Sequence, residues 1–148
     1  MLTLGIKCSK DTLDWAVVQG STRSGATEID DGKATAPAGD RGAQLVWLRR
    51  EVLELLERHP AEQVALRVAE SSGQSLSLER VEVEGVVQEA IGSLGLTCHR
   101  LYAATLRSKY SARNAAALEA AYASEPLIAA KAKTRRDPLV VALAVLPA

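Results

Sequence analysis

The sequence predicts one α/β domain over residues 1–148, built on a mixed five-stranded sheet flanked by helices. A chain of 148 residues that is 47% hydrophobic can build one core without disulfides or metal. Strand-like alternation dominates the N-terminal third, and strand-like and helical segments then alternate. That order predicts an antiparallel hairpin followed by parallel strands joined through helices.

The first three elements are expected to be strands. Residues 2–8 and 12–18 alternate between apolar and other side chains, and the polar residues 9–11 between them predict a hairpin turn. A third strand is expected over residues 27–35, where Asp30-Asp31-Gly32 predicts a turn or a bulge.

The middle of the chain predicts two helices and two strands. Asp40 is a candidate N-cap for a helix that ends at His59-Pro60. Residues 62–70 are expected to form a strand, followed by a small polar loop at residues 71–75. A second helix ends at Gly95, and residues 96–101 form a further strand. The apolar positions that repeat with helical spacing are Leu45, Leu48, Val52, Leu55 and Leu56 in the first helix, and Val83, Val86, Val87, Ala90, Ile91 and Leu94 in the second.

The C-terminal third is expected to be helical. One helix runs from Ala103 to Asn114 with an alanine-rich continuation to Tyr122, before a break near Glu125-Pro126. The last helix opens with Asp137 as N-cap and Pro138 at the first helical position. Residues 139–146 carry almost no polar atoms, so this helix must be buried or must dock on a partner.

Composition excludes several classes of protein. The two cysteines lack the spacing of a zinc site and are too few for a disulfide framework, which favours a reducing compartment. No apolar run reaches the length of a membrane span, so we expect a cytoplasmic protein without membrane contact. Net charge is zero, yet residues 100–136 hold eight basic residues against Glu119 and Glu125, so phosphate contact is left open beside an ordinary solvated face.

Other candidate groups are weaker. Ser71-Ser72-Gly73 lacks the glycine spacing of a phosphate loop and is expected to be a turn. His59 is expected to cap a helix, and the neighbouring Cys98 and His99 have no third partner for nucleophilic catalysis.

Three short strings resemble the RuvC branch of the ribonuclease H-like superfamily. They are Leu4-Gly5-Ile6-Lys7-Cys8-Ser9, Gln63-Val64-Ala65-Leu66-Arg67 and the segment from Arg136 to Ala144. The resemblance places Lys7 where these nucleases have a metal-holding aspartate, and Arg67 on a glutamate, or Glu70 if the register shifts by three. Asp137 matches the first aspartate of the closing helix, and Val140 replaces the second. The chain looks most like small RuvC-like proteins of unknown function with the same replacements.

This resemblance implies a degenerate site. Two-metal phosphodiester cleavage needs several converging carboxylates, and a lysine ammonium among them repels divalent cations. The first hypothesis is therefore a catalytically inactive RuvC-like domain that holds no metal or other cofactor and serves as a binding or structural subunit in a nucleic-acid-processing or defence assembly. Its vestigial catalytic residues are Glu70 and Asp137, its partner is another protein or a second copy, and nucleic acid is left open. The candidate binding residues are Lys7, Arg67, Arg107, Lys131, Lys133, Arg135 and Arg136.

Two alternatives remain from the sequence. One is a magnesium-dependent nuclease with a rearranged site, built from Glu70, Asp137 and either Asp14 or Asp11, which requires these carboxylates to lie together. The other is a dimerisation module that docks the apolar segment 139–146 across a two-fold axis.

Overall fold

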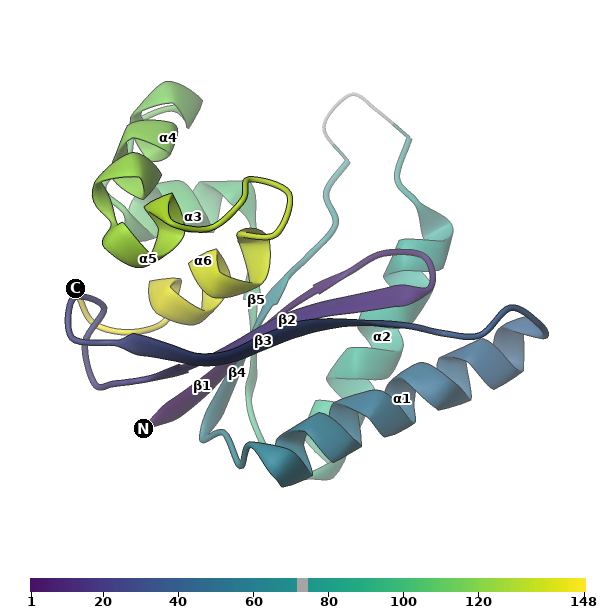
Figure 1. Cartoon of the computed structure of the whole chain (residues 1–148). Helices are drawn as coiled ribbons and strands as arrows, with labels where there is room; N and C mark the ends of the chain where they lie inside the picture. The colour runs from purple at the N-terminus through teal and green to yellow at the C-terminus, as the bar shows by residue number, and fades with distance from the viewer. Residues whose placement is uncertain (72–74) are drawn as a thin grey trace.

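The computed structural model of the chain describes residues 1–71 and 75–148 (Figure 1). The predicted turn at Ser71-Ser72-Gly73 therefore lies largely outside the described residues. The five expected strands form one sheet of order β3-β2-β1-β4-β5. They are β1 (Leu2–Cys8), β2 (Thr12–Gln19), β3 (Thr27–Thr35), β4 (Gln63–Arg67) and β5 (Cys98–Leu101).

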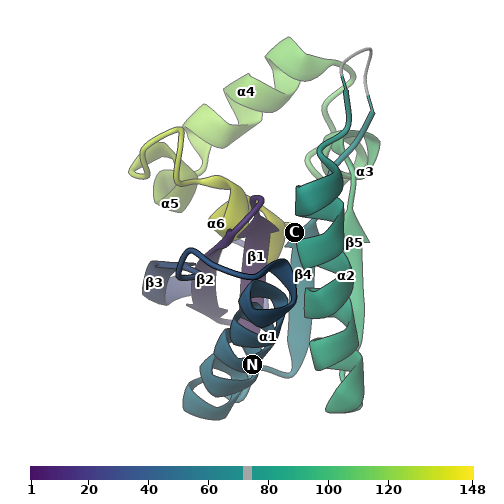
Figure 2. The same cartoon turned by 90° about the vertical axis from the view of Figure 1, so that its right-hand side faces the viewer.

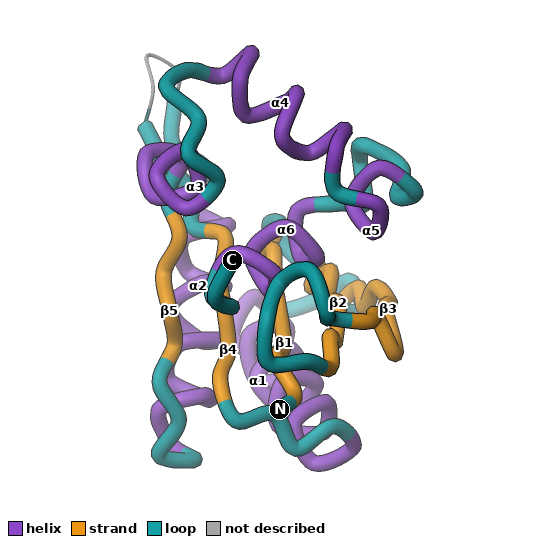
Figure 3. Tube along the Cα trace, turned by 90° about the vertical axis from the view of Figure 1, so that its left-hand side faces the viewer, coloured by secondary structure: helices purple, strands orange, loops and turns teal. Residues whose placement is uncertain are grey.

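The strand directions confirm the predicted mixed sheet. β1 pairs antiparallel with β2, and β2 pairs antiparallel with β3. β1 and β4, and β4 and β5, pair in parallel. Figure 3 shows the result, with β1 in the middle and β3 and β5 at the two edges.

Helices cover both faces of this sheet. Two long helices, α1 (Arg41–Arg58) and α2 (Leu78–Ser93), lie together on one face. The short helix α6 (Asp137–Ala144) lies on the other (Figures 1 and 2). The remaining helices lie on the α6 side, and they are α3 (Ala103–Lys109), α4 (Ala115–Ser124) and α5 (Pro126–Ala129).

The signals that predicted α1 act as expected. The Asp40 carboxylate accepts a hydrogen bond from the Ala43 N–H at 3.0 Å, which satisfies one of the free donors of the first turn. His59 ends the helix, as its position before Pro60 predicts. The residues that α1 buries are Leu48, Val52, Leu55 and Leu56.

Successive residues of β1 face opposite sides of the sheet and so contribute to two separate cores. Leu4, Ile6 and Cys8 pack toward α1 and α2, and Gly5 faces α6. A Cβ atom added at Gly5 would lie 1.9 Å from the Pro138 carbonyl oxygen and 2.9 Å from the Ala142 Cβ. The absence of a side chain at this position therefore lets α6 lie directly on the centre of the sheet.

The apolar C-terminal helix is buried against the sheet of its own chain. Every residue from Pro138 to Ala144 is buried, and those from Leu139 on belong to a cluster that includes Ala16, Val18 and Ala65 of the sheet. The hypothesis that residues 139–146 dock across a two-fold axis is therefore wrong, because this helix offers a second copy no free apolar face.

The expected helix from Ala103 through Tyr122 is wrong in its continuity. α3 ends at Lys109, Ser111 adopts a positive φ of 54°, and the Asn114 side chain caps α4 by accepting from the Ala117 N–H at 2.8 Å.

The expected strand over residues 62–70 is shorter in the structure, since β4 ends at Arg67. In α2, Val86 is only partly buried and Leu94 is exposed. No helix in the described part of the chain is long and apolar enough to cross a membrane.

The predicted irregularity of the third strand falls next to Asp30. The register shifts between Val17, opposite Asp30, and Val18, opposite Glu28, so Ile29 is the additional residue. Gly32 is not part of this bulge. It leaves room for the indole ring of Trp15, because a Cβ on Gly32 would lie 2.3 Å from that ring. The edge strand therefore uses its glycine to accept a large cross-strand neighbour.

Candidate functional site

The strand register places the candidate residues in one row across the sheet. Lys7 lies opposite Asp14 on one side and opposite Arg67 on the other. Residues paired in register share a face of the sheet, and Lys7, two residues after Gly5, is on the face that α6 covers. The row thus lies beside the N-terminus of α6.

Lys7 forms an ion pair with Asp137. Its Nζ lies 3.2 Å from Asp137 Oδ2, and about a third of each side chain is exposed (32% and 37%). Asp137 is the first residue of α6 and Arg136 is its N-cap, one position earlier than the sequence predicts. A carboxylate in the first turn also interacts favourably with the helix dipole. The lysine thus occupies the space in front of the closing helix.

Arg67 forms the second ion pair at the end of β4. Its Nη1 donates to Glu70 Oε2 at 2.9 Å and to the carbonyl oxygens of Val68 at 2.9 Å and Leu101 at 3.3 Å. Arg67 and Glu70 are therefore partners, and Arg67 is the one in register with Lys7.

Glu70 is held from two directions. Besides Arg67, the Ala103 N–H donates to Glu70 Oε2 at 2.8 Å, so the carboxylate joins the end of β4 to the start of α3. Partial burial acts to raise the pKa of Glu70. The Ala103 hydrogen bond, the Arg67 ion pair and the charge of Arg107 outweigh it and hold the pKa below its usual value. Glu70 is thus committed as an anion to contacts within the chain.

A buried carboxylate of α2, which the sequence did not single out, supports this corner. Glu84 is 5% exposed and accepts from the Ala69 N–H at 2.9 and 3.1 Å and from Arg80 Nε at 2.8 Å. Arg80 Nη2 in turn donates to the Arg67 carbonyl oxygen at 3.1 Å. The pair fixes the backbone on which Arg67 and Glu70 stand.

Asp11 and Asp14, the two aspartates considered for a rearranged metal site, lie in different parts of the hairpin. Asp11 lies in the hairpin turn, where it accepts from the Thr12 hydroxyl at 3.0 Å. Asp14 lies within β2, not at the turn, and its Oδ1 is buried without a hydrogen-bond partner among the described residues. Asp14 is therefore the carboxylate nearest in register to Lys7.

The donor set does not fit the divalent ions that the fold family implies. Within residues 1–71 and 75–148, no group of three His, Cys, Asp or Glu side chains lies close enough to hold a metal ion. Glu70 and Asp137 are each paired with a cation of the chain. The rearranged site of Glu70, Asp137 and Asp14 or Asp11 would need these oxygens to converge without a lysine or arginine among them, whereas here Lys7 and Arg67 lie against two of the three carboxylates.

The five candidate binding residues of the C-terminal third divide into two groups. Arg107 lies on α3, close enough to lower the pKa of Glu70. The other four follow α5. Lys131 Nζ binds Glu28 at 2.6 Å and Asp31 at 3.0 Å, Arg135 lies 3.8 Å from Asp31, and Arg136 pairs with Glu119. Lys131, Arg135 and Arg136 are thus paired with carboxylates within the fold.

Lys133 differs from its neighbours. It is exposed and makes no ion pair with any described residue. Together with Lys131 and Arg136 it lines a pocket of about 230 Å³ next to the ring of Tyr122. Three cations of the predicted basic segment thus meet at this pocket.

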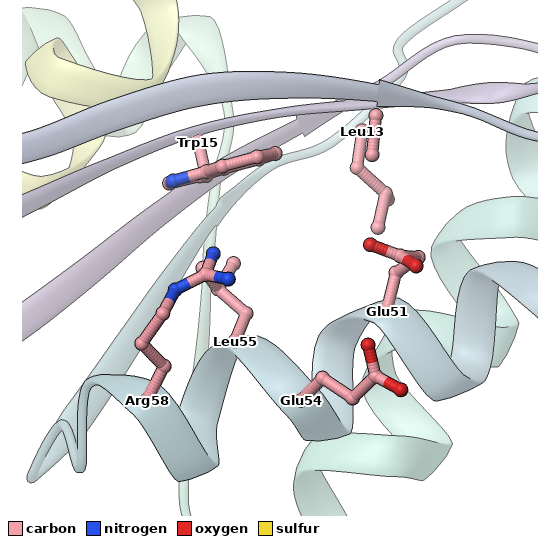
Figure 4. A pocket seen from close by; sticks show the side chains of 7 residues that line it. Leu13, Trp15, Glu51, Glu54, Leu55 and Arg58 are labelled. Carbon is pink, nitrogen blue, oxygen red and sulfur yellow. The ribbon is translucent and has the colours of Figure 1, made fainter.

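The cavity beside Trp15 and the predicted helix cap at His59 both have structural explanations. The cavity between Trp15 and Glu51, Glu54 and Arg58 of α1 (Figure 4) has a volume of about 10 Å³, which is the size of a single water. His59 Nε2 lies 2.7 Å from Asp30 Oδ2, so it joins the end of α1 to β3.

Comparison with known proteins shows a likeness in fold. No protein-family model matches the sequence, and no curated protein does. Thermus thermophilus RuvC is similar over 97% of this chain and 92% of its own, with a TM-score of 0.78 and 18% identity. The same protein in complex with a Holliday junction substrate gives a TM-score of 0.75, 19% identity and coverage of 97% and 91%. The yeast mitochondrial Holliday junction resolvase gives a TM-score of 0.54, 10% identity and coverage of 96% and 77%.

These likenesses confirm the predicted ribonuclease H-like fold, with its mixed sheet and flanking helices. Identities of this size establish the fold and leave the chemistry to the residues of this chain.

Proposed function

We propose that this chain is a catalytically inactive RuvC-like domain that works as a binding or structural subunit in a nucleic-acid-processing or defence assembly. The observation that carries the proposal is the Lys7–Asp137 ion pair, with Nζ 3.2 Å from Oδ2. The second ion pair, Arg67–Glu70, supports it from the neighbouring strand.

The physical argument concerns charge. Two-metal cleavage gathers carboxylates so that two divalent cations can hold the attacking and leaving oxygens. Here a lysine and an arginine stand in adjacent register positions at the middle of the sheet. Their positive charges stabilise Asp137 and Glu70 directly, and they oppose the approach of a divalent cation to the same oxygens. The chain's own cations take the place that metal ions would need.

The partner that we propose is branched DNA. The solved neighbours include RuvC in complex with a Holliday junction, and this chain shares its fold over nearly its whole length. The cations lining the pocket beside Tyr122 are the candidate phosphate contacts, with exposed Lys133 the one free of internal ion pairs among described residues.

Calorimetric titration with Mg²⁺ and Mn²⁺ tests the inactive site. We expect no binding heat for the wild-type protein and measurable binding for the double variant Lys7→Asp/Arg67→Glu, which restores carboxylates at both positions. The matched control is Lys10→Asp/Arg50→Glu, which makes the same change of charge at exposed positions and should not bind. Metal binding by the wild type, together with metal-dependent cleavage of a four-way junction, would overturn the proposal in favour of a nuclease with a rearranged carboxylate site.

Fluorescence anisotropy with a labelled four-way DNA junction tests the partner. Lys133→Glu should weaken binding and reduce the slope of log affinity against log salt by about one. Lys10→Glu, an exposed lysine on the β1–β2 turn, serves as the control. Equal affinity of wild type and Lys133→Glu would exclude this surface as the DNA contact.

A further inference from the structure

A hollow on the α6 side of the sheet is bounded by α4, α5 and the segment that leads into α6, which lie close together in Figure 1. Its volume is about 230 Å³, below the roughly 300–1,000 Å³ of sites that enclose a whole small molecule. Lys131, Lys133 and Arg136 line it together with Tyr122 and the apolar side chain of Ile128. We call it the Tyr122 pocket, and its size suits one end group of a larger ligand.

The three cations of the Tyr122 pocket keep N–H donors that the chain does not use. A lysine ammonium has three donors and an arginine guanidinium has five. Lys131 gives two of its donors to carboxylates of β3, and Arg136 gives its Nη2 to Glu119. Lys133 makes no ion pair within residues 1–71 and 75–148. All three cations can therefore donate to a bound ligand without giving up their present partners.

Tyr122 adds a neutral donor to the same lining. The residue is only 5% exposed, and the Arg136 guanidinium lies over its ring, 4.8 Å from the centroid. The hydroxyl of the neighbouring Tyr110 donates to the Val140 carbonyl oxygen at 3.2 Å, whereas the Tyr122 hydroxyl has no hydrogen-bond partner in the described part of the chain. Burial raises the pKa of Tyr122 to about 12, so the hydroxyl keeps its proton at neutral pH. A donor without an acceptor in a poorly solvated place costs free energy that a bound acceptor recovers.

Donors reach the Tyr122 pocket from several directions and face one carboxylate. Tyr122 belongs to α4, and the cations follow α5 around a turn that the Arg135 N–H closes on the Ala132 carbonyl oxygen at 2.9 Å. The carboxylate is Glu119, whose pKa is lowered chiefly by its hydrogen bond from Arg136. Because that guanidinium offsets its charge, an anion with several acceptor oxygens suits the rest of the lining.

A terminal phosphate fits this lining better than an internal one. A phosphate monoester has three strong acceptor oxygens and a charge of about −1.5 to −2 at neutral pH. An internal phosphate of a nucleic-acid strand has a single charge and two links to sugars, both of which would have to leave a small pocket. We propose that the Tyr122 pocket binds a phosphate monoester at the end of its ligand, either the 5′-phosphate of a nucleic-acid strand or that of a free nucleotide. This inference rests on the proposed function in assigning phosphate contacts to the same cations.

Calorimetric titration with a short DNA strand that carries either a 5′-phosphate or a 5′-hydroxyl tests the site at fixed salt concentration. The phosphorylated strand should bind about tenfold more tightly or better, because its extra oxygens accept charge-assisted hydrogen bonds. Lys133→Gln and Tyr122→Phe should each reduce this preference. Tyr122→Phe keeps the ring beneath Arg136 and should leave the melting temperature unchanged, since the lost hydroxyl has no partner in the described chain. Lys10→Gln, at an exposed position of the β1–β2 turn, is the matched control and should retain the full preference.

Adenosine 5′-monophosphate, with adenosine as its control, separates the two sources of the monoester. Equal affinity for the nucleotide and for the phosphorylated strand would assign the site to a free nucleotide. Clearly tighter binding of the strand would assign it to a strand end. Both results support a monoester site, provided that adenosine does not bind and that Lys133→Gln weakens the binding.

Equal binding of the phosphorylated and hydroxyl strands would overturn the inference, as would a preference that survives both substitutions. Its failure can be told apart from failure of the proposed function. If a four-way junction with only 5′-hydroxyl ends binds fully and loses affinity in Lys133→Gln, the DNA-binding function stands and the monoester site falls. If the nucleotide binds through Lys133 and the junction does not bind at all, the monoester site stands and the proposed DNA partner falls.

Discussion

The ammonium nitrogen of Lys7 lies 3.2 Å from a carboxylate oxygen of Asp137, across the join between β1 and α6. The two residues are 130 positions apart in the chain, and they meet because α6 rests on the backbone of β1 at Gly5. The ion pair and the missing side chain at Gly5 are thus two parts of one contact.

Replacing Gly5 by alanine should disrupt this contact. The new Cβ would lie 1.9 Å from the Pro138 carbonyl oxygen, and a backbone atom at the start of a fully packed helix cannot move aside cheaply. We expect Gly5→Ala to lower the free energy of unfolding by about 3 kcal/mol, measured by urea denaturation. The control, Gly92→Ala, meets no atom within 4 Å and should raise the free energy of unfolding by about 0.5–1 kcal/mol. Similar effects of the two substitutions would contradict the tight approach of α6.

The element order could be predicted because each element carries a local signal. Asp40 and His59-Pro60 bound α1, and the alternation of the first strands gives the hairpin. The break between α3 and α4 could not be predicted from the sequence. It depends on Ser111 at positive φ, a conformation that favours glycine or asparagine, and on an N-cap at Asn114 within an otherwise helical pattern.

The candidate site was predictable in its residues but not in its connections. Lys7, Arg67, Glu70 and Asp137 were found through short strings around strand ends and the last helix. The sequence could not show that Arg67 and Glu70 pair with each other, because this contact depends on the directions that the two side chains take after β4 has ended. Arg80 and Glu84 were missed because an i,i+4 pair on a charged helix has the same pattern whether it faces solvent or, as here, the end of a strand.

Removing the Glu84 carboxylate should be costly. Glu84→Ala leaves the Ala69 N–H without its acceptor and Arg80 Nε without its ion-pair partner in a poorly solvated place. We expect a loss of about 3 kcal/mol in the free energy of unfolding. The matched control is Glu82→Ala on the same helix, where the pair with Arg41 is half exposed and the loss should stay below about 1 kcal/mol. Equal losses in chemical denaturation would mean that Glu84 is not buried in solution.

The two cysteines should react slowly with alkylating reagents in the folded protein. Burial strongly raises the pKa of the Cys8 thiol, and burial raises the pKa of Cys98 to about 11. The thiolate is the reactive form, so little of either is present at neutral pH. Timed iodoacetamide labelling read by mass spectrometry should modify half-buried Cys98 slowly and fully buried Cys8 only on unfolding. Rapid labelling of Cys8 would show that β1 is not held between its neighbours as described.

The Glu70 carboxylate should make stability depend on pH in the acid range. Its pKa is lowered in the folded protein because the Ala103 N–H, Arg67 and Arg107 together outweigh the effect of burial. A group whose pKa falls on folding stabilises the fold above its unfolded pKa, about 4.3 for glutamate, and that stabilisation disappears as the pH drops through the lower folded value. Wild type should therefore exceed Glu70→Gln in free energy of unfolding at neutral pH, and the difference should shrink between about pH 5 and pH 2. The measurement is urea denaturation of both proteins across this range. A difference that is constant with pH, or that grows toward acid, would mean that the carboxylate does not accept from Arg67 and Ala103 as an anion, and the ion pair at the end of β4 would lose its support.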